Sequence, residues 1–191
     1  MGKLTEHLSP RQISFIEQQH LFFVATAAAE GTVNLSPKGM DSFRILNEKQ
    51  VIWLNVTGSG NETAAHVQQN PRMTVMFCAL RGAPDILRLY GQATAIHRAD
   101  PAWQSYISLF PELPGTRQLF LLDIDQVQSS CGMSVPLFDY VGERDSLIAW
   151  AEKKGPAGVE AYWAQRNQIS LDGFESHILE KSGTAAKFSS D

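Results

Sequence analysis

Cysteine is scarce in this sequence of 191 residues, which contains only Cys78 and Cys131. These two residues lie far apart along the chain, so they provide neither a disulfide framework nor a four-cysteine zinc site. The five histidines show no metal-ligand spacing, and we expect no metal site. Such sparse cysteine is typical of proteins with reduced thiols, which predicts a cytoplasmic location.

Long apolar runs and basic runs are also lacking. No apolar run approaches the roughly 20 residues that cross a bilayer, and residues 1–10 are polar and charged, so we expect neither a membrane anchor nor a signal peptide. Lys and Arg total 16 against 20 Asp and Glu, a net charge of −4 that argues against binding to nucleic acid or to anionic membranes. The hydrophobic share of 43% is typical of a globular protein.

The sequence contains no recognisable set of catalytic side chains. It has no Gly-x-Ser-x-Gly, Walker or dinucleotide-binding pattern. A nucleophilic cysteine needs a neighbouring base, and none is evident for Cys131. His66 is a lone helical histidine, which is more often structural than catalytic. We therefore expect a bound cofactor to supply any chemistry.

The most informative segment that is present lies at residues 54–66. An apolar strand, Val51–Leu54, leads through a Thr-Gly-Ser-Gly-Asn turn into a helix over about residues 62–69. Glycines let the backbone approach a ligand, and the free N–H groups of a helix start can hold a phosphate. The same residues also suit a plain connection in which Ser59 and Glu62 form a capping box. We expect the loop to hold a phosphorylated cofactor.

A phosphate dianion also calls for paired cations. The candidates are Lys38 in a Ser-Pro-Lys-Gly turn, Arg44 at the start of a strand, and Arg88 within the apolar segment Ile86–Tyr90. Arg88 is the most telling of the three, because an arginine in an apolar strand needs a partner or a ligand. Strand alternation could equally point Arg88 to solvent, and Lys38 could simply be solvated.

Hydrophobic alternation and turn residues predict about six strands in hairpin order between residues 21 and 128, after a short helix that begins at Ser9-Pro10. Few helices separate the strands, which favours a mostly antiparallel barrel. From Asp145 the pattern changes to helix, with a break at Gly155-Pro156. The polar residues from about 175 onward predict a frayed tail.

Five segments, taken in order, resemble one known family. They are Val24–Ala27, Val33–Gly39, Phe43–Leu46, Trp53–Asn55 with the loop that follows, and Asn70–Phe77. The set resembles the pyridoxamine 5′-phosphate oxidase-like FMN-binding split-barrel family over roughly residues 10–135. The resemblance implies a mainly β fold, namely a six-stranded antiparallel split β-barrel with a C-terminal helical extension, in a homodimer with FMN at the subunit interface.

The resemblance also divides the chain and assigns cofactor contacts. It implies a split barrel with an N-terminal helix at 1–135, a helical extension at 136–175 packed on the barrel or the partner subunit, and a flexible tail at 176–191. Arg44 would lie near the phosphate and the loop from Ser59 to Thr63 would receive it, while Ser129–Cys131 would approach the flavin ring edge. The implied cofactor-binding residues are Lys38, Arg44, Ile45, Leu46, Leu54, Asn55, Ser59, Gly60, Asn61, Glu62, Thr63, Leu87, Arg88, Ser129, Ser130 and Cys131.

Two departures from the family pattern shape the functional expectation. The oxidase that gives the family its name has an Arg-Lys pair in the phosphate loop, where this chain has Asn61, Glu62 and Thr63. Its C-terminal Arg-x-His-Asp-Arg substrate motif is replaced by Tyr140–Arg144. We therefore expect an FMN-dependent oxidoreductase acting on another small organic substrate, with NADH or NADPH as a candidate electron donor. The alternative is a non-enzymatic module that binds flavin, deazaflavin F420 or haem for storage or sensing.

Overall fold

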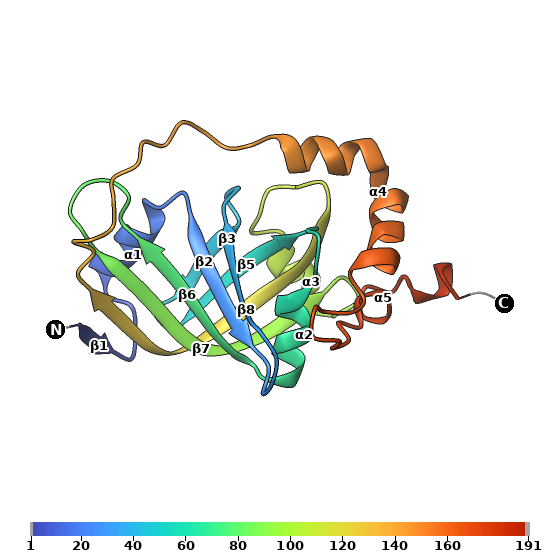
Figure 1. Ribbon diagram of the computed structural model, residues 1–191, viewed down its shortest axis with the longest axis horizontal. Coiled ribbons are helices and arrows are strands. Elements are labelled where there is room, and N and C mark those ends of the chain that lie inside the picture. Colours follow the sequence, from blue (N-terminus) through green and yellow to red (C-terminus); the bar gives the residue numbers. More distant parts are fainter. Residues whose placement is uncertain (1, 190–191) are drawn as a thin grey trace.

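The strands form one antiparallel sheet that curls into a barrel with helices around it, in a computed structural model that describes residues 2–189 (Figure 1). The strands are β1 (Lys3–Thr5), β2 (Phe22–Ala27), β3 (Val33–Lys38), β4 (Phe43–Asn47), β5 (Gln50–Val56), β6 (Arg72–Cys78), β7 (Ile86–His97) and β8 (Thr116–Ser130). The helices are α1 (Pro10–Glu17), α2 (Glu62–Gln69), α3 (Trp103–Ile107), α4 (Ser146–Arg166) and α5 (Ile178–Lys181), followed by a 3₁₀ turn at Ala185–Lys187.

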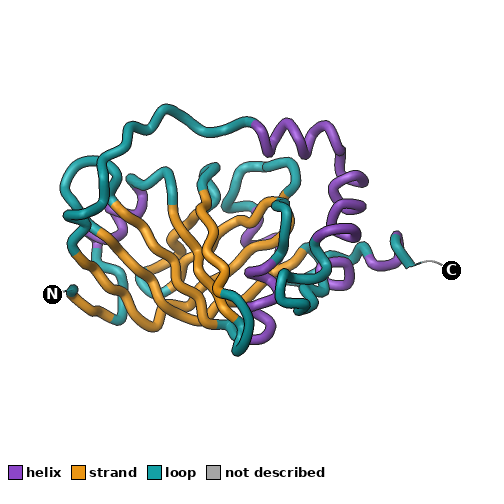
Figure 2. The backbone as a smooth tube through the Cα atoms, in the orientation of Figure 1, coloured by secondary structure: helices purple, strands orange, loops and turns teal. Residues whose placement is uncertain are grey.

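The sheet order is β3-β2-β6-β7-β8-β5-β4, with β1 paired to the end of β8. Its two outer strands, β3 and β4, are not paired with each other in the described residues, and Figure 2 shows the strands wrapping around a common interior. Aromatic side chains bridge β4 to β2 and β6: the ring centroids of Phe22 and Phe43 are 5.0 Å apart, and those of Phe43 and Phe77 are 5.1 Å apart. The mainly antiparallel split barrel with a helix at its C-terminal end is therefore confirmed.

The strand count is higher than expected, at eight rather than six. The extra pairing comes partly from β1, whose three residues carry no apolar pattern and are ordered by pairing with Val127–Ser129. The last strand also begins at Thr116 rather than at residue 120, because it pairs with both β5 and β7. At Gly91 a Cβ atom would clash with the carbonyl of Asp123, so this bulge between β7 and β8 requires glycine.

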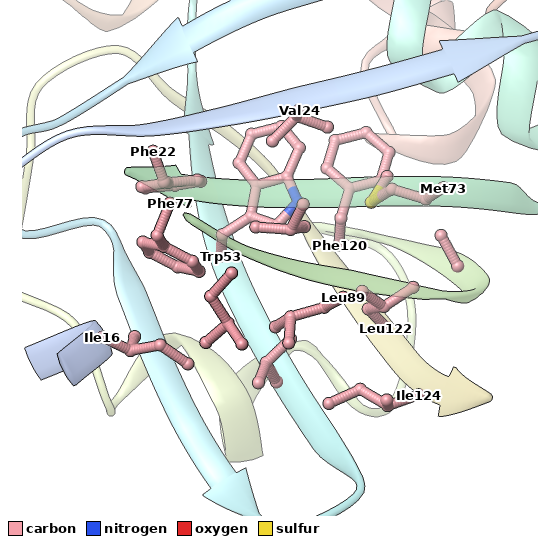
Figure 3. Packing of buried hydrophobic residues seen from close by; sticks show 14 of the residues in the cluster. Ile16, Phe22, Val24, Trp53, Met73, Phe77, Leu89, Phe120, Leu122 and Ile124 are labelled. Carbon is pink, nitrogen blue, oxygen red and sulfur yellow. The ribbon is translucent and has the colours of Figure 1, made fainter. Parts of the chain in front are cut away.

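The barrel interior is filled by apolar side chains from nearly every strand (Figure 3). Val24, Val75, Leu89 and Phe120 are fully buried, and Phe120 stacks on Trp53 with ring centroids 4.7 Å apart. Burial on this scale contributes roughly 25 cal/mol per Å² of apolar surface removed from water. The core therefore makes β5 a rigid support for the loop that follows it.

The chain after β8 crosses the top of the barrel in Figure 1 and then turns down as α4. The backbone leaves helical geometry at Gly155, with φ of 64°, where the sequence predicted a break. We expected a flexible tail at 176–191, but Ser176 and Ile178 are fully buried. Ile178 packs against Val159 and Trp163 of α4. Residues 190 and 191 lie outside the described part. None of the described helices combines the length and apolarity that a membrane span requires.

Candidate functional site

A polar pocket of about 270 Å³ lies in the gap between β3 and β5, beside the loop that precedes α2. Strand alternation directs Asn34, Ser36 and Lys38 of β3 toward it, since they occupy every second position. The rest of its wall consists of Asn55 and Val56 of β5, residues 58–63 of the loop and the start of α2, and Arg117 of β8. The pocket thus joins segments from four parts of the chain.

Two cations line this pocket without a counter-ion. Lys38 is half-buried, and its Nζ lies 5.3 Å from the ring centroid of Trp53. Burial, together with the nearby charge of Arg117, lowers the pKa of Lys38 to about 8. Arg117 is 3% exposed, and burial lowers its pKa to about 9. Across residues 2–189 neither side chain has a carboxylate oxygen within 4.0 Å, so the pocket favours an anionic ligand.

The guanidinium of Arg117 is held against the loop but keeps hydrogen-bonding capacity. Its Nη1 donates to the carbonyl of Gly60 at 2.9 Å and to Oδ1 of Asn167 at 2.6 Å. Its Nε is buried without a hydrogen-bond partner among the described residues. An orphaned donor on a buried arginine suits a ligand that brings acceptor oxygens, as a phosphate does.

The loop itself differs from a capping box. Ser59 and Glu62 do not cap each other, and Asn61 holds the N-cap position without a side-chain cap bond. The carboxylate of Glu62 instead accepts the N–H of Leu171 at 3.0 Å. This contact engages the one acidic side chain of the pocket wall and leaves the exposed Ser59 available to a ligand.

The structure gathers seven of the sixteen predicted cofactor-binding residues in this pocket. They are Lys38, Asn55, Ser59, Gly60, Asn61, Glu62 and Thr63. Asn55 Nδ2 donates to Gln118 Oε1 at 3.0 Å, and Thr63 Oγ1 accepts from Asn34 Nδ2 at 3.1 Å. These bonds tie β3, β5, β8 and α2 together around the pocket.

Arg44 lies elsewhere. Its guanidinium forms a two-point ion pair with Asp41, at 2.7 and 2.9 Å, and stacks over the ring of Phe110. With Ile45 it lines a larger hollow of about 730 Å³ between α1, β4 and the segment around Tyr140. Leu46, Leu54 and Leu87 are packed in or against the hydrophobic clusters, so their side chains do not reach the polar pocket.

The remaining predicted residues form a separate group at the far end of β7 and β8. Arg88 Nη1 donates to Ser130 Oγ at 3.0 Å, so this arginine has a protein partner. Ser129, Ser130 and Cys131 line a third hollow beside α1. The structure does not bring this group into the polar pocket, and its contact with a cofactor stays a prediction.

Sequence reasoning missed Arg117, Asn34 and Ser36. The argument applied to Arg88 would have found Arg117, since Arg117 also stands at an otherwise apolar strand, ahead of Leu119–Leu122. A strand predicted from residue 120 leaves Arg117 outside it, whereas β8 begins at Thr116. Asn34 and Ser36 carry the alternation of an ordinary exposed strand and give no local signal.

Comparisons with known proteins add a family context. The family model described as pyridoxamine 5′-phosphate oxidase matches residues 8–131. A curated protein of Aspergillus flavus, the pyridoxamine 5′-phosphate oxidase family protein ustO, is 40% identical over 186 positions, which span 88% of this chain and 75% of that protein.

Solved structures share the fold at low sequence identity. A candidate pyridoxamine 5′-phosphate oxidase from Lactobacillus delbrueckii has a TM-score of 0.52 at 20% identity, over 64% of this chain and 94% of its own. A single-residue variant of HupZ from Group A Streptococcus has a TM-score of 0.52 at 19% identity, over 64% of this chain and 98% of its own. Residues after 131 lie beyond the family match.

Proposed function

Because this chain belongs to the pyridoxamine 5′-phosphate oxidase family, we propose that it binds FMN through the polar pocket and acts as an FMN-dependent oxidoreductase. One observation carries the proposal: Lys38 and Arg117 both line the pocket, and among residues 2–189 neither has a carboxylate oxygen within 4.0 Å. A half-buried lysine and a buried arginine without ion-pair partners are unfavourable in the free protein, and a phosphate dianion would relieve that cost.

The residues present fit the non-reacting end of FMN. Lys38 and Arg117 would hold the phosphate, together with N–H groups of the loop at 59–63. Asn34, Ser36 and Asn55 supply neutral hydrogen-bonding groups that suit the ribityl hydroxyls. The pocket wall therefore offers positive charge to the phosphate and neutral polar groups to the ribityl chain.

Bound FMN would supply hydride or single-electron transfer, which the pocket's own side chains do not. The titratable groups of the described pocket wall are Lys38, Glu62 and Arg117, which form no nucleophile–base pair. The chain would contribute binding and positioning. We propose a small organic substrate other than pyridoxamine phosphate, since Tyr140–Arg144 replaces the family's substrate motif, with NADH or NADPH as electron donor.

We also propose a cytoplasmic homodimer in which the two subunits share the flavin. Arg88 and Ser129–Cys131 lie outside the polar pocket and are candidates for contacts made across such an interface. In the same proposal, residues 1–135 form the cofactor-binding barrel and 136–175 the helical extension.

The test is a visible spectrum of the purified protein, followed by titration with FMN and with riboflavin. We expect a yellow protein, or a colourless one that takes up FMN in preference to riboflavin, and bleaching by NADH or NADPH without oxygen. A protein that does not bind added FMN would overturn the proposal. A Soret band in place of flavin absorption would overturn it in favour of a haem-binding module.

A further inference from the structure

The chain that follows the barrel makes hydrogen bonds to both ends of the loop between β5 and α2, which we call the phosphate loop. We call residues 163–176 the C-terminal clasp. Its Trp163 Nε1 donates to Thr57 Oγ1 at 2.8 Å, where the loop begins, and its Leu171 N–H donates to Glu62 Oε2 at 3.0 Å, where α2 begins. In Figure 1 this part of the chain descends through α4 toward α2 and α3. The clasp is therefore placed to fix the loop between those two contacts.

Asn167 is the centre of the clasp and is fully buried. Its Oδ1 accepts from Arg117 Nη1 at 2.6 Å, and its Nδ2 donates to the carbonyl of Gly58 at 3.3 Å. Its backbone carbonyl accepts from Ser176 Oγ and, at 3.4 Å, from Asn61 Nδ2. One side chain thus holds the pocket's buried cation and the backbone of the loop in a fixed relation.

The neutrality of Asn167 matters as much as its position. A buried arginine is usually paired with a carboxylate, which would cancel its charge. An amide oxygen orients the guanidinium equally well but leaves the full positive charge for a ligand. On the other side of the loop, the clasp supplies the Leu171 N–H to Glu62, the acidic group of the pocket wall. The clasp therefore holds the guanidinium of Arg117 in place without neutralising it, and it donates a hydrogen bond to the carboxylate of Glu62.

We propose that Asn167 is a specificity-determining residue, which positions Arg117 and the loop at Gly58–Asn61 so that the pocket selects a terminal phosphate monoester over the same molecule without its phosphate. Asn167 is then part of the binding site, although it lies beyond residues 8–131 that match the family. The identity of the ester as FMN rests on the proposed function, whereas selection of a phosphate does not.

The test compares Asn167→Asp with Gln168→Glu. Both change an amide to a carboxylate at neighbouring positions, but Gln168 is exposed, and within residues 2–189 its side chain makes one hydrogen bond, from Nε2 to the carbonyl of Ala164. For Asn167→Asp we expect the preference for FMN over riboflavin to fall by about 10-fold or more, because a carboxylate would neutralise Arg117. Riboflavin affinity itself should hardly change. Gln168→Glu should keep the wild-type preference, and equal effects of the two substitutions would overturn the proposal.

A second variant separates positioning from charge. Asn167→Ala removes the amide without adding a carboxylate, and it serves as the main comparison if Asn167→Asp does not fold. We expect faster hydrogen exchange at the amides of residues 58–61 and weaker binding of inorganic phosphate, measured by calorimetry. Unchanged exchange and unchanged phosphate binding would overturn the proposal.

The outcomes also separate this inference from the proposed function. If the wild-type protein binds inorganic phosphate but not FMN, and Asn167→Asp weakens that binding, the FMN proposal fails and the role of Asn167 stands. If FMN binds but its preference over riboflavin is the same in Asn167→Asp, the role of Asn167 fails and the FMN proposal stands. If neither FMN nor phosphate binds, both are overturned.

Discussion

Replacing Lys38 by methionine is expected to stabilise the free protein and to weaken its binding of FMN. Burial lowers the pKa of Lys38 from 10.5 to about 8, so holding its charged form in the pocket costs free energy. At about 1.4 kcal/mol per pKa unit, that cost is at most about 3.5 kcal/mol. Since the side chain is only half-buried, we expect Lys38→Met to raise the free energy of unfolding at pH 7 by about 1–3 kcal/mol.

The pH dependence gives the same effect a definite sign. The pKa of Lys38 is lower in the folded chain than in the unfolded one, so between pH 8 and 10.5 the unfolded state binds more protons. The free energy of unfolding contributed by Lys38 therefore rises with pH across that interval, and the penalty is fully present below it. Lys38→Met removes the penalty and should flatten this part of the stability profile.

The effect on FMN runs in the opposite direction. Loss of a charge-assisted hydrogen bond to phosphate costs about 1.5–3 kcal/mol, so the Kd for FMN should rise about 10- to 150-fold. Urea unfolding measures the first effect and flavin fluorescence titration the second. Lys49→Met is the matched control, because Lys49 is exposed and lies outside the pocket, and it should change neither quantity. The reasoning is refuted if Lys38→Met destabilises the free protein or leaves the Kd for FMN unchanged.

Three further predictions follow from the same contacts. The Kd for FMN should rise with pH above about 8, by up to about tenfold per pH unit, because bound phosphate favours protonated Lys38; calorimetry across pH 7–9.5 checks this, and a flat profile would contradict it. Arg44→Ala should change the Kd for FMN by no more than about twofold, because Arg44 is paired with Asp41 outside the pocket. A rise in that Kd of more than about tenfold would show that the phosphate binds near β4 instead. Trp163→Phe should lower the free energy of unfolding in urea by about 1–3 kcal/mol, because it removes the hydrogen bond to the buried Thr57; no loss would show that the bond contributes nothing.

Several local features of the fold follow from short stretches of the sequence. The helix after the loop was predicted over residues 62–69, and α2 covers those residues, because Asn70-Pro71 ends it. The break in α4 was predicted from Gly155-Pro156 and occurs at Gly155. These features depend on turn and helix-end chemistry that a short window contains. β1 has no such local pattern. It is a strand because it pairs with β8, and a short window of sequence does not contain that information.

The polar pocket was only partly predictable, for a different reason. The loop and Lys38 carry their own signals, in glycine and in charge. Asn167 contacts Arg117 and Gly58, which precede it by 50 and 109 residues, and no local pattern encodes such contacts. The tail was expected to fray on composition, yet Ile178 is buried by side chains of α4. Long-range packing decided both outcomes, and a single sequence does not display it.

The most direct measurement is a crystal structure of the protein with FMN bound. The account predicts that the phosphate lies in the polar pocket, within hydrogen-bond distance of Lys38 Nζ and a guanidinium nitrogen of Arg117, and close to the loop at residues 59–63. A phosphate bound elsewhere, for example beside Arg44 or Arg88, would contradict the account even if the protein proved to be a flavoprotein.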